Sequence, residues 1–253
     1  GSEMCIRDRI ENIHIAANIT WSFASPEGTS YANLGVGGVI GNGHAQTMTV
    51  HNCTMSGEMQ ISDGSLGYGF LHIGSIVGNI AANIRNCSSI GKINVGCKGG
   101  IIYIGGIVGG NNSTANETEH CINTSSITLS NTERSNTNYA VSVGGIGGYL
   151  IGKVLGCCNQ GSITGHSLSS VDIGGIGGLT ELVKCHLSRN LTTDFNVTSE
   201  ETVRLGYLIG HLKSSTVYSC NESVGKQTKW IGSDPAWTPT LLSLIHISEP
   251  TRP

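Results

Sequence analysis

Cysteine is the residue type whose spacing first suggests chemistry in this chain. The chain holds nine cysteines, and six of them recur at intervals of 28 to 36 residues, each three residues after an apolar residue or a threonine. A recurring thiol can serve as a disulfide partner, as a metal ligand or as a small apolar side chain in a core. The six cysteines of this series are Cys53, Cys87, Cys121, Cys157, Cys185 and Cys220.

We expect the series to be a column of buried thiols with a packing role. Stacked β-strands place in-register neighbours about 4.8 Å apart, farther than the roughly 3.5–4.5 Å between the Cβ atoms of a relaxed disulfide. Ile13 occupies the corresponding place in an earlier, incomplete copy, where a ligand position would not accept isoleucine. No Cys-x-x-Cys spacing is present, so we predict no zinc site and no cofactor. Cys97 and Cys158 lie outside the series, and the sequence identifies no disulfide partner for either.

Histidines and carboxylates do not assemble into a recognisable catalytic or metal site. His51, His120 and His186 lie beside cysteines of the series at offsets of −2, −1 and +1, so they are not expected to stack on one face. Asp172 is the only aspartate inside a glycine-rich segment, and we expect it to be an outward, solvated side chain. Cleavage of a polysaccharide needs two or three carboxylates, or carboxylates with Arg or Lys, on one face. We therefore predict no catalytic residue and no metal ligand.

Asparagine followed by any residue and then Ser or Thr is the acceptor pattern for N-glycosylation. The chain has ten such positions, whereas about four are expected by chance from the acceptor rule. Asn52 and Asn86 belong to the repeat itself, but a cluster near residues 111–123 does not. We predict an extracellular glycoprotein, with candidate glycosylation sites at Asn111, Asn112, Asn116, Asn123, Asn190 and Asn196.

These residues belong to a two-part repeat that dominates the sequence. Its first half reads apolar-x-apolar-Gly-x-apolar-apolar-Gly, as in LHIGSIVG at 71–78. Its second half holds the cysteine, a small residue four positions later and an apolar residue two further on. The fourth position of the first half is always glycine, where we expect either a positive φ or a bend too tight for a Cβ atom. These bend glycines are Gly37, Gly74, Gly105, Gly144, Gly174 and Gly206.

The alternation of apolar residues in each unit predicts short strands with one face inward. A unit of about 33 residues then forms one coil of two or three strands, and stacking of coils buries a continuous core. We predict an all-β parallel β-helix, or β-solenoid, of six to seven coils, right-handed because of strand twist. Insertions should leave the coil as loops at 111–119 and 132–138. A β-sandwich or a propeller is less consistent with one pair of motifs in every unit and with 5% aromatic residues.

Composition argues against several classes of function. With 12% charged residues and a net charge of −3, the chain lacks the basic stripe of a nucleic-acid-binding protein. Glycine interrupts the longest apolar stretches, so no segment of about 20 residues suits a bilayer. The glycine motifs also lack the following helix that a phosphate-binding loop requires.

The glycine-rich half followed by an Asn-Cys half resembles the GLUG repeat of large surface proteins from bacteria and protists. The resemblance covers residues 10–225, and residues 226–241 are expected to form a cap or linker. It implies an adhesin-like structural stalk or display segment that is not an enzyme, located at the cell surface or secreted, with host-cell or matrix glycans or proteins as partners. The alternative is a fragment of a carbohydrate-active β-helix enzyme, a polysaccharide lyase or hydrolase, whose catalytic coils are missing.

The two ends of the chain differ from the repeats. Residues 1–9 (GSEMCIRDR) and 242–253 (LSLIHISEPTRP) resemble translated adapter sequence from shotgun sequencing libraries. We expect both segments to be artefacts, so Cys5 and His246 are set aside as site residues.

Overall fold

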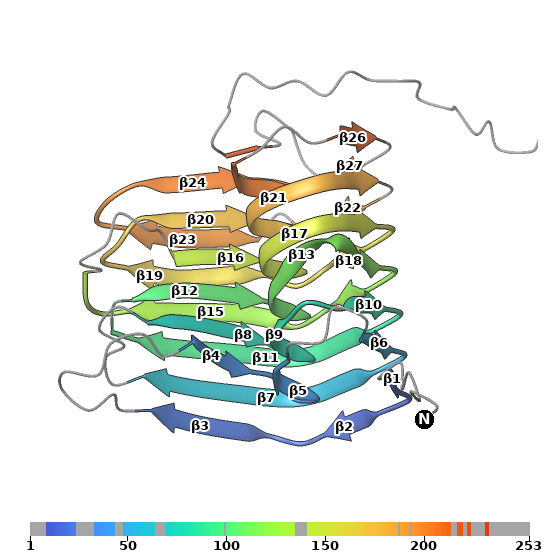
Figure 1. Cartoon of the computed structure of the whole chain (residues 1–253). Coiled ribbons are helices and arrows are strands. Elements are labelled where there is room, and N and C mark those ends of the chain that lie inside the picture. The colour runs from blue at the N-terminus through green and yellow to red at the C-terminus, as the bar shows by residue number, and fades with distance from the viewer. Residues whose placement is uncertain are drawn as a thin grey trace, which may run out of the picture.

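The computed structural model is a stack of parallel β-strands (Figure 1). It describes residues 9–23, 33–43, 48–63, 69–98, 100–134, 141–186, 188–192, 194–213, 217–219, 222–223 and 231–232. No helix occurs among these residues, and every pairing between their strands is parallel. The predicted all-β parallel solenoid is confirmed, with about five turns instead of six to seven.

The strands form three sheets, and each coil contributes in turn to all three (Figure 1). Sheet C holds the strands that open each glycine-rich motif: β4 (Asn33–Val36), β8 (Phe70–Gly74), β12 (Ile101–Gly105), β16 (Val141–Gly144), β20 (Val171–Gly174) and β24 (Val203–Gly206). Sheet A follows the bend: β1 (Arg9–Glu11), β5 (Ile40–Asn42), β6 (Thr49–His51), β9 (Val77–Ile80), β10 (Asn83–Arg85), β13 (Val108–Glu119), β17 (Gly147–Leu155), β21 (Gly177–His186), β25 (Ile209–Leu212) and β26 (Val217–Ser219). Sheet B completes the coil: β2 (His14–Ala16), β3 (Ile19–Phe23), β7 (Thr54–Asp63), β11 (Ser88–Cys97), β14 (Ile122–Asn123), β15 (Ser126–Asn131), β18 (Cys158–Asn159), β19 (Ile163–Ser167), β22 (Arg189–Asn190), β23 (Phe195–Ser199) and β27 (Glu222–Ser223).

Register between coils follows the repeat, so equivalent residues form columns along the stack. Ile73 lies opposite Ile104 in sheet C, and Ile93 lies opposite Ile127 in sheet B. These side chains are almost wholly buried and belong to one continuous hydrophobic core. Because each coil buries its apolar face only against its neighbours, the stack itself supplies the core.

The bend glycines are required by close approach and not by a positive φ. None of the six has a positive φ. A Cβ atom on Gly74 would fall on the carbonyl oxygen of Val77, and one on Gly105 would fall on that of Val108. Of the two explanations offered by the sequence, the steric one therefore holds. Gly74, Gly105, Gly144, Gly174 and Gly206 are paired in register, and Gly37 directly follows β4.

From the second motif onward, the glycine that ends the motif lies against the backbone of the preceding coil. A Cβ atom on Gly109 would overlap the backbone nitrogen of Ile73, and one on Gly148 would overlap that of Ile104. Only glycine allows the two backbones to approach so closely. On the side of sheet C away from the core, side chains of sheet C pack against side chains of sheet A in a second, smaller cluster. We call this region the outer layer. Its members include His72, Tyr103, Ser142, Asp172, Arg204, Tyr149, Leu179 and His211.

The insertion expected as a loop at 111–119 is instead part of a strand. Residues 108–119 form β13, which pairs with β17 on both sides of a register shift between Asn112 and Glu117. The extra residues are absorbed as a β-bulge, so the expectation of a loop here is wrong. The other expected loop, 132–138, lies mostly outside the described residues.

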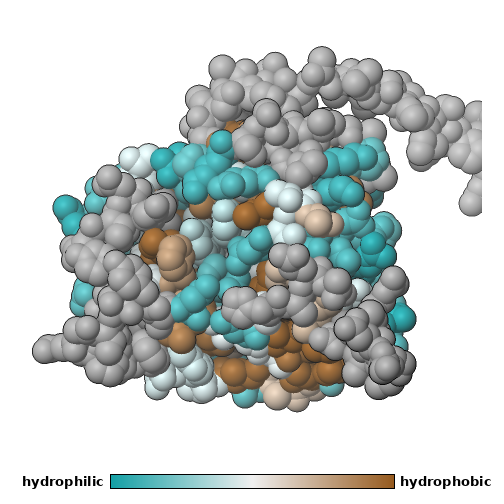
Figure 2. All heavy atoms as spheres, viewed as in Figure 1, coloured by the Kyte–Doolittle hydropathy of each residue, from teal (hydrophilic) through white to brown (hydrophobic). Residues whose placement is uncertain are grey.

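The face of the molecule seen in Figure 1 has no single chemical character. Figure 2 shows hydrophobic and hydrophilic residues mixed over the face seen in Figure 1. Within the described part of the chain, no helix has the length and hydropathy needed to cross a membrane.

Candidate functional site

Four cysteines form a buried column at the corner between sheet A and sheet B. Cys53, Cys87, Cys121 and Cys157 are each at most 1% exposed. Each follows a residue of positive φ, namely Asn52, Asn86, His120 and Gly156. This left-handed residue turns the chain so that the next side chain points inward. Each thiol donates to the carbonyl oxygen two residues earlier, and none of the four forms a disulfide.

The fifth place in the thiol column belongs to Ser188 and not to Cys185. Asn159 lies opposite Asn190, so Ser188 follows Cys157 in the stack. The Ser188 hydroxyl donates to the carbonyl oxygen of His186 at 3.4 Å, the bond that each thiol makes. Cys185 lies opposite Val154 in sheet A, so it occupies the apolar place of the motif, three residues before the place of the thiol.

The misplacement of Cys185 has a local cause. Leu182-x-x-Cys185 has the spacing of the motif by coincidence, but the register makes Cys185-x-x-Ser188 the equivalent of Val154-x-x-Cys157. The prediction for Cys185 as a member of the column is therefore wrong. Cys220 lies outside the described residues.

Burial and mutual hydrogen bonding make these thiols poor nucleophiles. The hydrogen bond with Cys121, together with burial, raises the pKa of Cys87. Burial raises the pKa of Cys185 to about 12. Because the thiolate is the reactive and metal-binding form, a raised pKa makes Cys87 and Cys185 poor nucleophiles and poor metal ligands. The described residues contain no group of three or more His, Cys, Asp or Glu side chains that could hold a metal ion.

The two remaining described cysteines occupy different environments. Cys97 is buried in the main core, where β11 ends. Cys158 is partly exposed, and burial raises its pKa. Neither forms a disulfide.

A column of asparagines, which sequence analysis did not find, lies two residues beyond the thiol column. Asn123, Asn159 and Asn190 are each at most 1% exposed. The Asn123 amide donates to the Asn159 oxygen at 2.9 Å, and the Asn159 amide donates to the Asn190 oxygen at 3.0 Å. Each amide also donates to the carbonyl oxygen two residues further along the chain. The sequence signal is the recurrence of Asn two residues after Cys121, Cys157 and Ser188.

Four of the six predicted glycosylation sites are inaccessible in the folded chain. Asn123 and Asn190 belong to the asparagine column, and the Asn111 amide donates to the Ala82 carbonyl oxygen at 3.0 Å. Asn116 is 3% exposed. The expectation of an accessible cluster is wrong because the segment is a strand. Asn112 and Asn196 are exposed, and glycosylation at these two positions stays a prediction.

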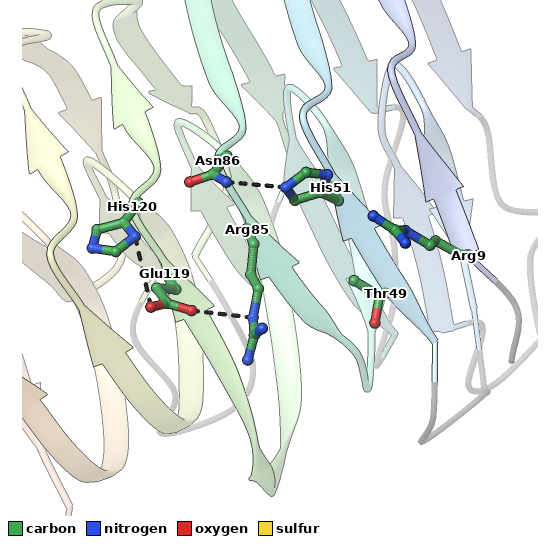
Figure 3. Close-up of a pocket in the computed structure, with 7 residues that line it drawn as sticks. All are labelled: Arg9, Thr49, His51, Arg85, Asn86, Glu119 and His120. Carbon is green, nitrogen blue, oxygen red and sulfur yellow. Dashed lines mark hydrogen bonds and ion pairs between the residues drawn. The ribbon is translucent and has the colours of Figure 1, made fainter.

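A hollow of about 570 Å³ opens beside the thiol corner, on the outside of sheet A (Figure 3). The Asn86 amide lies 3.0 Å from Nε2 of His51. One Glu119 oxygen lies 3.1 Å from Nε of Arg85, and the other lies 3.6 Å from Nδ1 of His120. The lining residues are Arg9, Thr49, His51, Arg85, Asn86, Glu119 and His120. Arg9 belongs to the terminal segment that we expect to be an artefact.

The carboxylates beside this hollow are neutralised by cations on neighbouring coils. Arg85 also contacts Glu117 at 2.8 Å, and the Lys153 ammonium lies 2.9 Å from the other Glu117 oxygen. The Lys153 hydrogen bond is the main reason that the pKa of Glu117 is lowered. Glu117 is therefore an anion at neutral pH and a poor proton donor. Sequence analysis did not anticipate that Glu117 and Glu119 meet Arg85 across two coils.

The histidines do not converge on one point. His51 and His186 belong to the same column, but Arg85, Glu119 and Leu155 separate them. His120 lies at the corner itself. The offset of +1 predicted for His186 is wrong, because the residue in the thiol column is Ser188 and not Cys185. His186 lies two residues before Ser188, just as His51 lies two residues before Cys53.

Asp172 is not the solvated side chain that was expected. It is 1% exposed and lies in the outer layer. Its two oxygens contact Nε of Arg204 at 2.5 Å and Nδ1 of His211 at 3.2 Å. The prediction is wrong because β25 covers this side of sheet C, which the motif pattern did not reveal.

No family model matches the chain, and comparisons with curated proteins and with solved structures return no match. The described residues form a parallel solenoid with a buried thiol column, a hydrogen-bonded asparagine column and a hollow lined by paired charges.

Proposed function

We propose that this chain is a non-catalytic structural and adhesive segment of an extracellular surface protein. The observation that supports this proposal best is that the buried polar groups of the thiol and asparagine columns are hydrogen-bonded within the stack. The thiol and asparagine columns are buried and hydrogen-bonded from coil to coil, so their polar atoms serve the stack. Such a stack is extended along one axis and can present its outer faces at a distance from its anchor.

The environments of the acidic groups also favour this proposal. Asp172, Glu117 and Glu119 each have at least one cationic partner in the folded chain. A general acid needs a raised pKa, and a nucleophilic carboxylate needs an open approach. The resemblance to GLUG arrays supplies the cell-surface setting, and the exposed Asn196 is suited to carry a glycan there.

The test couples the full chain to beads and measures attachment to cultured cells and to extracellular-matrix proteins and glycans. We expect saturable attachment that free chain competes away. A panel of polysaccharides is incubated with the same preparation, and released reducing ends and unsaturated products are measured. Attachment without product release is the expected result. If the chain attaches to none of the tested surfaces, the adhesive role is contradicted. Release of sugar products would contradict the non-catalytic role.

The alternative proposal is a fragment of a carbohydrate-active β-helix enzyme that, in contrast to the expectation from the sequence, keeps its catalytic coils. The observation that favours it is the meeting of Glu117, Glu119 and Arg85 on adjacent coils, since acidic groups beside Arg are typical of sugar-cleaving sites on this fold. If the panel detects cleavage, Glu117→Gln should abolish it while Glu58→Gln, on sheet B, should not. Cleavage that survives Glu117→Gln would exclude this cluster as the active site.

A further inference from the structure

A second hollow, of about 290 Å³, opens over the outer layer and has a different lining from the first. Its walls come from four coils or more, because β4, β8, β12, β13 and β17 all contribute side chains. The lining residues are Asn33, Phe70, His72, Tyr103, Asn112, Tyr149 and Lys213.

Aromatic rings form one part of this lining. The Tyr103 ring centroid lies 5.1 Å from that of Tyr149 and 6.4 Å from that of Phe70. Tyr103 is 4% exposed and contacts both other rings, whereas Phe70 is 37% exposed. An exposed phenylalanine held against buried rings offers a fixed apolar surface, which would lower the entropy lost when a ligand binds.

Amide groups form a second part of the lining, and Asn33 lies beside Phe70 on the neighbouring strand. Asn33 and Asn112 are both exposed, and one N–H of the Asn112 amide donates to the Asn79 oxygen. An amide held by one bond keeps a carbonyl oxygen and a second N–H in a set direction. His72 adds a buried ring whose Nδ1 has no hydrogen-bond partner among the described residues.

Charge at this hollow is nearly balanced. The Lys213 ammonium lies 3.6 Å from a Glu181 oxygen and 5.9 Å from the centroid of the Tyr149 ring. The Tyr149 hydroxyl donates to the same Glu181 carboxylate at 3.0 Å. A phosphate or sulfate would therefore have to compete with Glu181 for the one cation among these lining residues.

We infer that this hollow binds a neutral saccharide of one or two pyranose rings. A pyranose has an apolar C–H face and a rim of hydroxyl groups, which match the Phe70 surface and the Asn33 and Asn112 amides. The volume is at the small end of the range for ligand sites, which suits one or two sugar units and not a folded partner. The inference rests on the proposed function, because it names the ligand class through which the segment would adhere.

The experiment titrates the full chain with neutral mono- to tetrasaccharides of glucose, galactose, mannose, N-acetylglucosamine and N-acetylgalactosamine. Saturation-transfer NMR and calorimetry report binding. Phe70→Ala should weaken the affinity at least tenfold, and Asn112→Ala should weaken it severalfold. The matched control is Ile90→Ala, which truncates another exposed hydrophobic side chain, 54% exposed, on sheet B. Thermal unfolding of each variant verifies that it is folded.

The outcomes separate this inference from the proposed function. Binding that Phe70→Ala weakens and Ile90→Ala leaves intact supports the site. Saccharide binding that survives Phe70→Ala overturns the site but leaves adhesion in place through another surface. Attachment to cells without binding of any neutral saccharide overturns the site alone. Failure of both the titration and the bead assay overturns both proposals. If Phe70→Ala does not fold, Phe70→Leu, which keeps bulk but loses the ring, takes its place.

Discussion

The main core and the outer layer share one coil spacing, but their columns are built differently. In the core, one residue type recurs from coil to coil, as with Cys53, Cys87 and Cys121. In the outer layer, neighbouring coils place His72, Tyr103, Ser142, Asp172 and Arg204 at equivalent positions of sheet C. Uniform columns maintain register, because every coil then offers its neighbours the same surface. The variable column gives each coil its own chemistry, and both the Asp172 ion pairs and the aromatic hollow arise there.

The largest expected effect comes from the contact that creates the outer layer. Gly109→Ala would place a Cβ atom on the backbone of Ile73, which cannot move without breaking sheet C. We expect destabilisation of at least about 3 kcal/mol, measured by chemical denaturation. Gly96→Ala is the control, since its Cβ would meet only the Ile61 carbonyl oxygen, at 3.8 Å. Equal stability of the two variants would contradict the close approach of the two strands.

A second test concerns the uniform asparagine column. Asn159→Ala removes the central amide and leaves buried partners on Asn123 and Asn190 without their bonds. We expect a loss of about 2–3 kcal/mol in the free energy of unfolding. The exposed Asn196→Ala variant should change it by less than about 0.5 kcal/mol. If Asn159→Ala is as mild as Asn196→Ala, the column does not contribute to stability.

The outer layer should make stability depend on pH through His72. Burial lowers the pKa of His72 to about 4 from an ordinary value of 6.5. Between those values the unfolded chain binds the proton and the folded chain does not, so stability should fall as the pH drops from 6.5 to 4. The expected loss by pH 4 is about 3 kcal/mol. His72→Gln should remove this part of the pH dependence, whereas His166→Gln, at an exposed position, should not; identical profiles for wild type and His72→Gln would refute the burial effect.

The smallest expected effect concerns the thiol column. Cys157→Ser should cost less than about 1 kcal/mol, because Ser188 already occupies the same column with the same hydrogen bond. Val154→Ser, in the same coil, introduces a hydroxyl where no equivalent bond exists and should cost more than about 2 kcal/mol. Similar losses in the two variants would show that Ser188 is not equivalent to the cysteines.

The repeat predicted the main core well but not the outer layer. Motif spacing was sufficient to place Cys53, Cys87 and Cys121 in one column, because each coil repeats the same pattern of apolar residues, glycine and cysteine. It failed at Cys185, because Leu182-x-x-Cys185 has the spacing of the motif three residues before its true place. It also failed at Asp172, whose burial depends on β25 and on the closing glycines. The hollow around Phe70 and Tyr149 is formed by side chains from sheets C and A of different coils. Such contacts do not recur from repeat to repeat in the sequence, so this hollow could not be predicted.

Register along the outer face of sheet B allows a direct test of the stacked coils. Thr20, Gln60, Asn94, Thr128, Thr164 and Asn196 lie opposite one another in successive coils. Nitroxide labels can be attached at the exposed Thr20, Gln60 and Asn196 through cysteines introduced there, in a Cys158→Ser background. Pulsed electron resonance then measures the distances between pairs of labels.

The stack predicts that the distance grows by about 4.8 Å for each coil between the labels. The Gln60–Asn196 pair spans four coil steps and should give about 19 Å, and the Thr20–Asn196 pair spans five and should give about 24 Å. Labels on one face point the same way, so their linkers alter both distances alike. Distances that do not increase by one step between the two pairs, or that exceed about 35 Å, would contradict the in-register solenoid.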